Sequence, residues 1–200
     1  MKSRLYNVTK YFGFLAVLSS WSCLIGLSLI HHTNWSEPIS QFGYYADTKR
    51  FFAGALIFAA IVWYLFSLHL NIYWRWSSLC TFFAGIFFII VGLIPYQPGE
   101  QTFIIDGHNI AILCSAVLYI MPMAFIGYKK SHQNVARLSK ILFYITLCLL
   151  ILSVSARAFN TAIIYAQTLA LLPVQIWLIA INLLILEQHK IAITKKDQLL

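Results

Sequence analysis

Six long apolar runs, separated by short polar stretches, dominate the chain. Each is long enough to cross a hydrocarbon core of about 30 Å as an α-helix, which takes about 20 residues. We therefore predict an all-α fold, a polytopic transmembrane bundle of six spans that forms a single domain over residues 1–200. The predicted helices cover about residues 11–30, 51–72, 77–95, 108–128, 139–158 and 161–186.

The composition agrees with a bilayer as the solvent of this chain. Hydrophobic residues make up 60% of it and charged residues 10%, whereas a soluble domain carries about 25% charged residues. So few charges would not cover the surface of a soluble domain. We predict an integral, multi-pass protein of a plasma membrane, most simply the inner membrane of a bacterium.

The 14 basic residues predict the orientation of the bundle. Most of them lie before the first helix, in the loops that follow the second and fourth helices, and in the C-terminal tail. These segments share one side of a six-helix bundle, so the positive-inside rule places both termini in the cytoplasm. The net charge of +8 then reflects topology, and we predict membrane lipids, but no nucleic acid, as partners.

Acidic residues and histidines gather on the opposite, outer side. The two longest connections lie there, one between the first and second helices and one between the third and fourth. We expect any site to lie at this outer end. The acids and histidines of this side are Glu37, Asp47, Glu100, Asp106, His31, His32 and His108.

Asp106 and His108 stand at the predicted start of the fourth helix. A carboxylate beside a histidine can hold its tautomer, and histidine changes charge near neutral pH, so the two could act as general acid and base. Ser40 is a more distant candidate nucleophile. The plainer interpretation is a helix cap with an interfacial histidine.

Asp47 and Arg50 lie three residues apart at the predicted start of the second helix, where they would share a face and pair. Arg157 closes the fifth helix on the same side, where its planar guanidinium could bind a phosphate or a carboxylate. These three residues, with Asp106 and His108, form the predicted ligand-binding set. The plainer interpretation is that Asp47 caps its helix and that the arginines anchor in the interface.

Histidines on the outer side raise the question of a metal or a cofactor. His31, His32 and His108 are weak candidates for zinc ligands, because they lack the helical spacing of known histidine motifs. A haem between one of the first two histidines and His108 is a further alternative. We predict neither a metal nor a cofactor.

Polar and small residues inside the predicted helices have packing roles in this interpretation. We expect Gln167, Gln175 and Asn182 to form hydrogen bonds between helices, and Gly85 and Gly92 to let two helices approach closely. His69, near the inner end of the second helix, is predicted to lie at the membrane interface.

Five positions resemble one membrane family. They are Ser40 and Gly43 in ISQFG, Gly92 and Pro95 in GLIP, and His108 in GHNIA. Their order over most of the chain is similar to the family catalogued as domain of unknown function 998. That family is similar in layout to the Frag, DRAM and Sfk-type six-helix proteins, some of which act in lipid-anchor remodelling or lipid signalling. The resemblance implies a six-helix bundle with a polar outer end, and it implies no particular reaction.

Two classes of function remain at this point. We favour a protein that binds a lipid headgroup or a small ligand at its outer polar end, because the mixed charges there suit a zwitterionic or anionic head. The alternative is a membrane-embedded enzyme that hydrolyses or remodels a lipid or lipid anchor with Asp106 and His108, with or without a metal. Whether the protein is an enzyme stays open.

Overall fold

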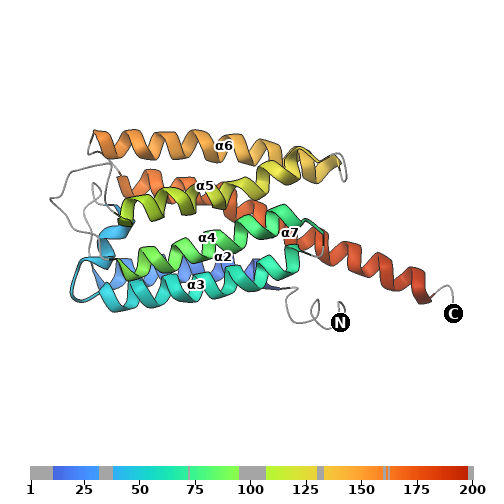
Figure 1. The fold of residues 1–200 in the computed structure, drawn as a ribbon, viewed down its shortest axis with the longest axis horizontal. Coiled ribbons are helices and arrows are strands. Elements are labelled where there is room, and N and C mark those ends of the chain that lie inside the picture. Colours follow the sequence, from blue (N-terminus) through green and yellow to red (C-terminus); the bar gives the residue numbers. More distant parts are fainter. Residues whose placement is uncertain are drawn as a thin grey trace.

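The computed structural model describes residues 11–31, 38–71, 73–94, 107–129, 133–159, 161 and 163–197. The side chains of residues 157, 158 and 188–197 lie outside this description. Within it the chain forms α-helices and one 3₁₀ helix (Figure 1). They are α2 (Phe12–Ile30), η1 (Ile39–Gly43), α3 (Lys49–Leu70), α4 (Arg75–Leu93), α5 (Gly107–Gly127), α6 (Gln133–Ala158) and α7 (Ile163–Asp197).

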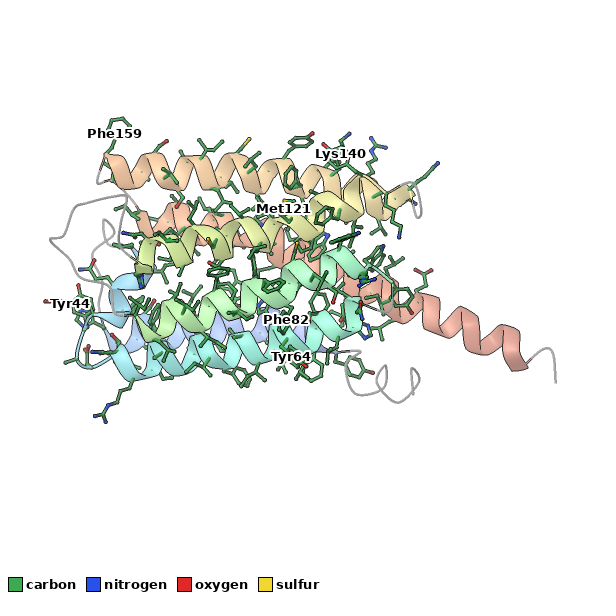
Figure 2. All side chains as sticks on the ribbon, viewed as in Figure 1. Tyr44, Tyr64, Phe82, Met121, Lys140 and Phe159 are labelled. Atoms are coloured by element: carbon green, nitrogen blue, oxygen red, sulfur yellow. The ribbon has the colours of Figure 1, made fainter. Side chains whose placement is uncertain are left out.

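The six α-helices are long and apolar enough to cross a membrane. This confirms the all-α fold with six spans and an integral membrane protein, whereas the orientation and the kind of membrane stay predictions. Large hydrophobic side chains such as Leu113 and Ile151 are exposed, as is Tyr64, which lies on the side of the bundle (Figure 2). Such extensive apolar exposure is expected where lipid, rather than water, surrounds the helices.

The helices pack in chain order, each against the next, and α7 also packs against α2, which closes the bundle. The main core between them contains the fully buried side chains of Trp63, Phe66, Met123 and Trp177. Trp177 also links two helices, because its Nε1–H donates a hydrogen bond to Ser139 Oγ of α6 over 3.0 Å.

Two helices extend well beyond their predicted bounds. Helix α6 begins at Gln133 rather than near residue 139, and α7 continues to Asp197 rather than ending near residue 186. Figure 1 shows the end of α7 projecting beyond the other helices. Both extensions contain lysine or arginine, so a search for apolar runs does not include them, although these residue types form helices readily.

Small residues bring α3 and α4 close together. A Cβ added at Gly85 would lie 3.3 Å from the carbonyl oxygen of Ala60, and one added at Gly92 would lie 3.4 Å from that of Ala53. The two glycines are seven residues apart, as are the two alanines, so the contacts repeat along one face. We call these four residues the α3–α4 seam, and they confirm the predicted packing role of the glycines.

The buried polar residues only partly follow the predictions. Asn182 Oδ1 on α7 accepts a hydrogen bond from Gly13 N on α2 over 3.3 Å, which confirms a bond between helices. Gln175 is buried on α7, and its Oε1 has no hydrogen-bond partner among the described residues. His69 is fully buried beside the α3–α4 corner, one residue before the end of α3, and its interfacial position stays a prediction. The neighbouring Leu70 belongs to the main core, which draws this end of α3 inward.

The contact between α5 and α6 can be tested with matched glycine substitutions. Gly127→Ala should lower the free energy of unfolding by about 1–3 kcal/mol, because its Cβ would lie 2.8 Å from Lys140 N. Unfolding in mixed micelles of increasing dodecyl sulfate content measures this. The control is Gly54→Ala, whose Cβ meets no atom within 4 Å. The control should be neutral or slightly stabilising, and equal stability of the two variants would contradict the close contact.

Candidate functional site

Residues 38–48, which we call the strap, cross one end of the bundle between α2 and α3. The η1 turn within the strap buries Phe42 against Leu27 of α2 and Phe52 of α3. The backbone N–H of Ile39 donates a hydrogen bond to Gln167 Oε1 of α7 over 2.8 Å. The strap is therefore attached to three helices. We call this end of the bundle the strap end, and it is the end that the sequence predicts to lie outside.

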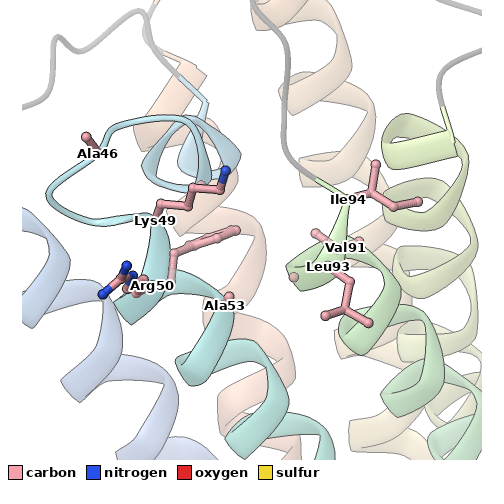
Figure 3. Close-up of a pocket in the computed structure, with 10 residues that line it drawn as sticks. Ala46, Lys49, Arg50, Ala53, Val91, Leu93 and Ile94 are labelled. Atoms are coloured by element: carbon pink, nitrogen blue, oxygen red, sulfur yellow. The ribbon is translucent and has the colours of Figure 1, made fainter.

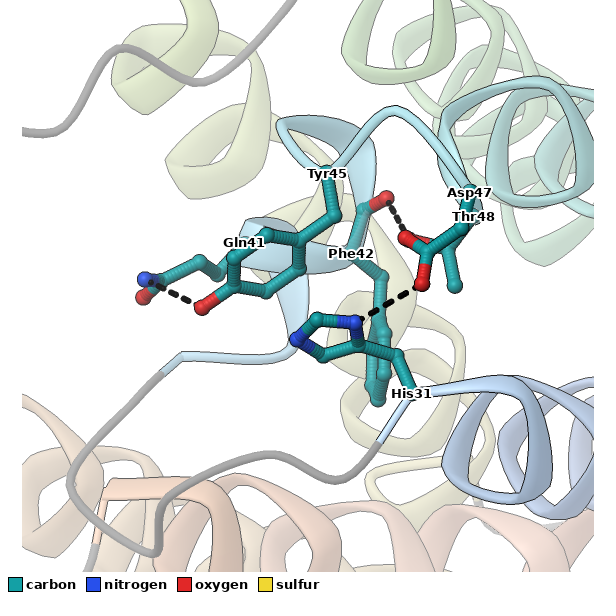
Figure 4. A network of polar contacts seen from close by, with 6 residues as sticks. All are labelled: His31, Gln41, Phe42, Tyr45, Asp47 and Thr48. Atoms are coloured by element: carbon teal, nitrogen blue, oxygen red, sulfur yellow. Dashed lines mark hydrogen bonds and ion pairs between the residues drawn. The ribbon is translucent and has the colours of Figure 1, made fainter.

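A histidine and an aspartate join the end of α2 to the strap (Figure 4). His31 Nδ1–H donates a hydrogen bond to Asp47 Oδ2 over 2.9 Å, which we call the His31–Asp47 clasp. The imidazole stacks on the ring of Tyr45, with centroids 3.9 Å apart and planes inclined by 21°. Gln41 Nε2 in turn donates to the Tyr45 hydroxyl over 2.9 Å. The imidazole thus contacts the strap twice, through its hydrogen bond to Asp47 and through its stacking on Tyr45.

The clasp corrects the predicted pairing of Asp47 with Arg50. Helix α3 begins at Lys49, so Asp47 lies before the helix, and its ion pair within the described part of the chain is with His31. The hydrogen bond from His31 holds the pKa of the Asp47 carboxyl below its ordinary value. Asp47 is not the cap of α3 either. Thr48 occupies that position, and its hydroxyl donates to the carbonyl oxygen of Phe42 over 2.7 Å.

His108 is fully buried at the strap end, near the start of α5. Its Nδ1 lies 2.8 Å from the carbonyl oxygen of Ile94, at the end of α4. A carbonyl only accepts, so Nδ1 carries the hydrogen and donates it. The last carbonyls of a helix lack partners within that helix, and the ring of His108 supplies one from α5. Asp106 lies outside the described residues, so the acid–base pair stays a prediction.

The other predicted site residues do not form a catalytic or metal centre in the described part of the chain. Ser40 is buried in η1, and its hydroxyl has no hydrogen-bond partner there, so no described base activates it. Among the described residues, no group of three histidine, cysteine or acidic side chains could hold a metal ion. His32 and the side chain of Arg157 lie outside the description.

A cleft of about 430 Å³ opens at the strap end between α3 and α4 (Figure 3). Its walls are Gly43 and Ala46 of the strap, Phe52 and Ala53 of α3, and Val91 and Leu93 of α4, with Lys49 and Arg50 among the other lining residues. No acid lines it within the described residues. In Figure 3, Lys49 extends toward the α4 side, whereas the guanidinium of Arg50 points toward α2. Lys49 is therefore the cation that faces the cleft.

Lys49 is the residue that the predicted site set lacks. The sequence predicts that Lys49 lies on the outer side, where there are few other cations. This exception to the positive-inside rule is the one feature of the sequence that could have indicated a binding role for Lys49. That signal does not show which way the side chain points. The direction depends on where α3 begins, and α3 begins two residues before its predicted start at 51.

A second, apolar groove of about 270 Å³ lies between α2 and α7, with Phe42 of the strap among its lining residues. Its two hydroxyl groups are internally satisfied. Ser28 Oγ donates to the carbonyl oxygen of Leu24, and Thr168 Oγ1 to that of Ile164. The groove therefore offers no unpaired hydroxyl donor to a ligand, and the two cavities differ in chemistry: only the α3–α4 cleft combines a charge with apolar walls.

No family model, no curated protein and no solved structure matches this chain. The resemblance to the family catalogued as domain of unknown function 998 stays a prediction. Function is therefore inferred from the cleft and the strap.

The His31–Asp47 clasp can be tested by titration. Because the pKa of the folded-state carboxyl lies below its ordinary value, the interaction stabilises the fold above the unfolded-state pKa and is lost as the pH falls through the folded-state pKa. His31→Ala should raise the titration midpoint of Asp47. The carboxyl carbon resonance in lipid nanodiscs reports the midpoint, and Asp47→Asn identifies that resonance. Identical midpoints in wild type and His31→Ala would show that the clasp does not form.

Proposed function

We propose that this protein binds the headgroup of a membrane amphiphile in the cleft between α3 and α4. The observation that carries this proposal is the composition of the cleft: about 430 Å³ of space at the polar end of membrane-spanning helices, with a lysine above apolar walls. A lipid is the ligand class that presents a polar head and hydrocarbon together at this depth. Binding sites in general combine apolar walls with a few placed polar groups.

The shape of the cleft favours a head inside and tails outside. The α3–α4 seam limits its depth, because Gly92 already approaches Ala53 closely at this level. The tails would then leave sideways past Leu93, whose side chain is 66% exposed on the lipid-facing side of α4. A lipid could thus enter the cleft laterally without leaving its leaflet.

The strap supports one wall of the cleft in a fixed position. Gly43 and Ala46 line the cleft, and the hydrogen bonds from Ile39 to Gln167 and from Thr48 to Phe42 hold the segment on either side of Gly43. A wall that is ordered before binding reduces the entropy lost when the ligand binds. This supports a binding role for the strap end.

The enzyme alternative gains no support from the described residues. His108 Nδ1 is engaged with the carbonyl oxygen of Ile94, and the hydroxyl of Ser40 is buried without a base. The hydrolase that uses Asp106 and His108 therefore stays a prediction, and binding without a reaction is the function that we propose.

Filling the cleft tests the proposal. Ala46→Trp should weaken binding of both dioctanoyl phosphatidylglycerol and dioctanoyl phosphatidylcholine by about tenfold or more, which corresponds to about 1.4 kcal/mol of lost contacts. Native mass spectrometry of the protein in a maltoside detergent measures the bound lipid. The control is Gly54→Trp, which places the same side chain on α3 at a position open to the surroundings. Wild-type protein that binds neither lipid, or equal binding by both variants, contradicts the proposed site.

A further inference from the structure

We infer that the cleft selects an anionic headgroup, a phosphate or a carboxylate, and that the His31–Asp47 clasp maintains this selectivity by keeping Asp47 away from Lys49. The inference rests on the proposed function, because it concerns the ligand of the same cleft. It assigns His31 as a positioning residue that acts through Asp47 and does not touch the ligand.

The first step is the charge of the lining. The described lining contains two basic residues, Lys49 and Arg50, and no carboxylate. Of the two, Lys49 extends toward α4, whereas the guanidinium of Arg50 points toward α2 (Figure 3). An anionic oxygen in the cleft would form a charge-assisted hydrogen bond with Lys49. The quaternary ammonium of a zwitterionic head would meet Lys49 as a like charge and would find no acid among the described lining residues. The cleft therefore favours a head with net negative charge.

The second step is the position of the nearest acid along the chain. Asp47 lies two residues before Lys49, and both side chains are exposed. An acid at this position would compete with an anionic ligand for the ammonium group of the lysine. The clasp removes it, because the carboxylate lies 2.9 Å from His31 Nδ1 on the side of the strap that faces α2 (Figure 4). Lys49 extends toward α4, on the other side (Figure 3).

The third step is the strength of this arrangement. The side chains of His31 and Asp47 are 28% and 48% exposed, and partly exposed ion pairs are weak. The stacking of the imidazole on Tyr45 adds a geometric restraint. Loss of the imidazole would therefore free the carboxylate at little cost. Asp47 would then reach Lys49, neutralise the cleft and compete with an anionic ligand.

The experiment compares three chain-bearing probes, each with the full-length protein in dodecyl maltoside. They are dioctanoyl phosphatidylglycerol, which carries a phosphate, decanoate, which carries a carboxylate, and dioctanoyl phosphatidylcholine, which is zwitterionic. Thermophoresis of labelled protein gives the dissociation constants. The wild type should bind at least one anionic probe about fivefold more tightly than the zwitterionic lipid, the effect of about 1 kcal/mol expected for one lysine. The tighter of the two anions identifies the head.

Variants at Lys49 test the selectivity. Lys49→Ala should abolish the preference for anionic probes, and Lys49→Arg should retain it. Lys129→Ala is the matched control, because it removes the same charge from an exposed position at the opposite end of the bundle. Equal affinity of the wild type for anionic and zwitterionic probes, or a preference that survives in Lys49→Ala, overturns the inference and leaves the proposed function standing. Failure of all three probes to bind overturns both.

The clasp is tested by rescue. His31→Ala should weaken anionic binding about fivefold, through competition by Asp47 for one lysine, while binding of the zwitterionic lipid stays unchanged. The double variant His31→Ala with Asp47→Asn should restore the wild-type affinity, because it removes the competing carboxylate. A loss that the double variant does not restore shows that His31 only supports the fold of the strap. Unchanged anionic binding in His31→Ala shows that the freed carboxylate does not reach Lys49, and either result overturns the role of the clasp.

Discussion

The α3–α4 seam is the contact on which the strap end depends. Between helices in lipid, close van der Waals packing replaces the hydrophobic effect as the main attraction, and small residues permit it. Gly85 and Gly92 bring α4 against the backbone of α3 at Ala60 and Ala53. The cleft lies at the same turn as the outermost of these contacts, where α3 begins and α4 ends. Closeness along the seam thus limits how deep a ligand can enter between these helices.

Hydrogen bonds between elements supply partners for backbone groups that would otherwise be unpaired at chain turns and helix ends. His108 of α5 donates to the carbonyl of Ile94 at the end of α4, and Asn182 of α7 accepts from the N–H of Gly13 at the start of α2. Gln167 of α7 likewise accepts a hydrogen bond from the N–H of Ile39 in the strap. Such groups are costly to leave unpaired at membrane depth. These three polar side chains therefore fix how neighbouring elements end relative to one another, which is a sufficient reason for their presence.

The sequence predicts the spans well because the length of each apolar run alone determines them. It also predicts the packing role of the two glycines and the hydrogen bond of Asn182, because such residues have few other uses inside a helix. The start of α6 and the end of α7 are missed, because the polar residues there carry no apolar signal. The site is predicted less well. His31 and Asp47 are 16 residues apart in the sequence, and their pairing depends on where the strap lies relative to the end of α2. The burial of His108 depends on the rotation of α5, and neither is visible as a local pattern. Orientation, the family resemblance and the roles of Asp106 and Arg157 stay predictions.

The position of Lys49, taken with the predicted orientation, would place the cleft in one leaflet of the membrane. Basic residues are concentrated at the other end of the predicted topology, and a cation on the translocated side opposes that trend. Lys49 has no acid beside it in the cleft, so pairing within the described lining does not account for it. An anionic ligand in the cleft would supply the missing counter-charge. With the predicted orientation, the proposed ligand would come from the outer leaflet, and a lipid drawn laterally from that leaflet would satisfy the charge without crossing the membrane.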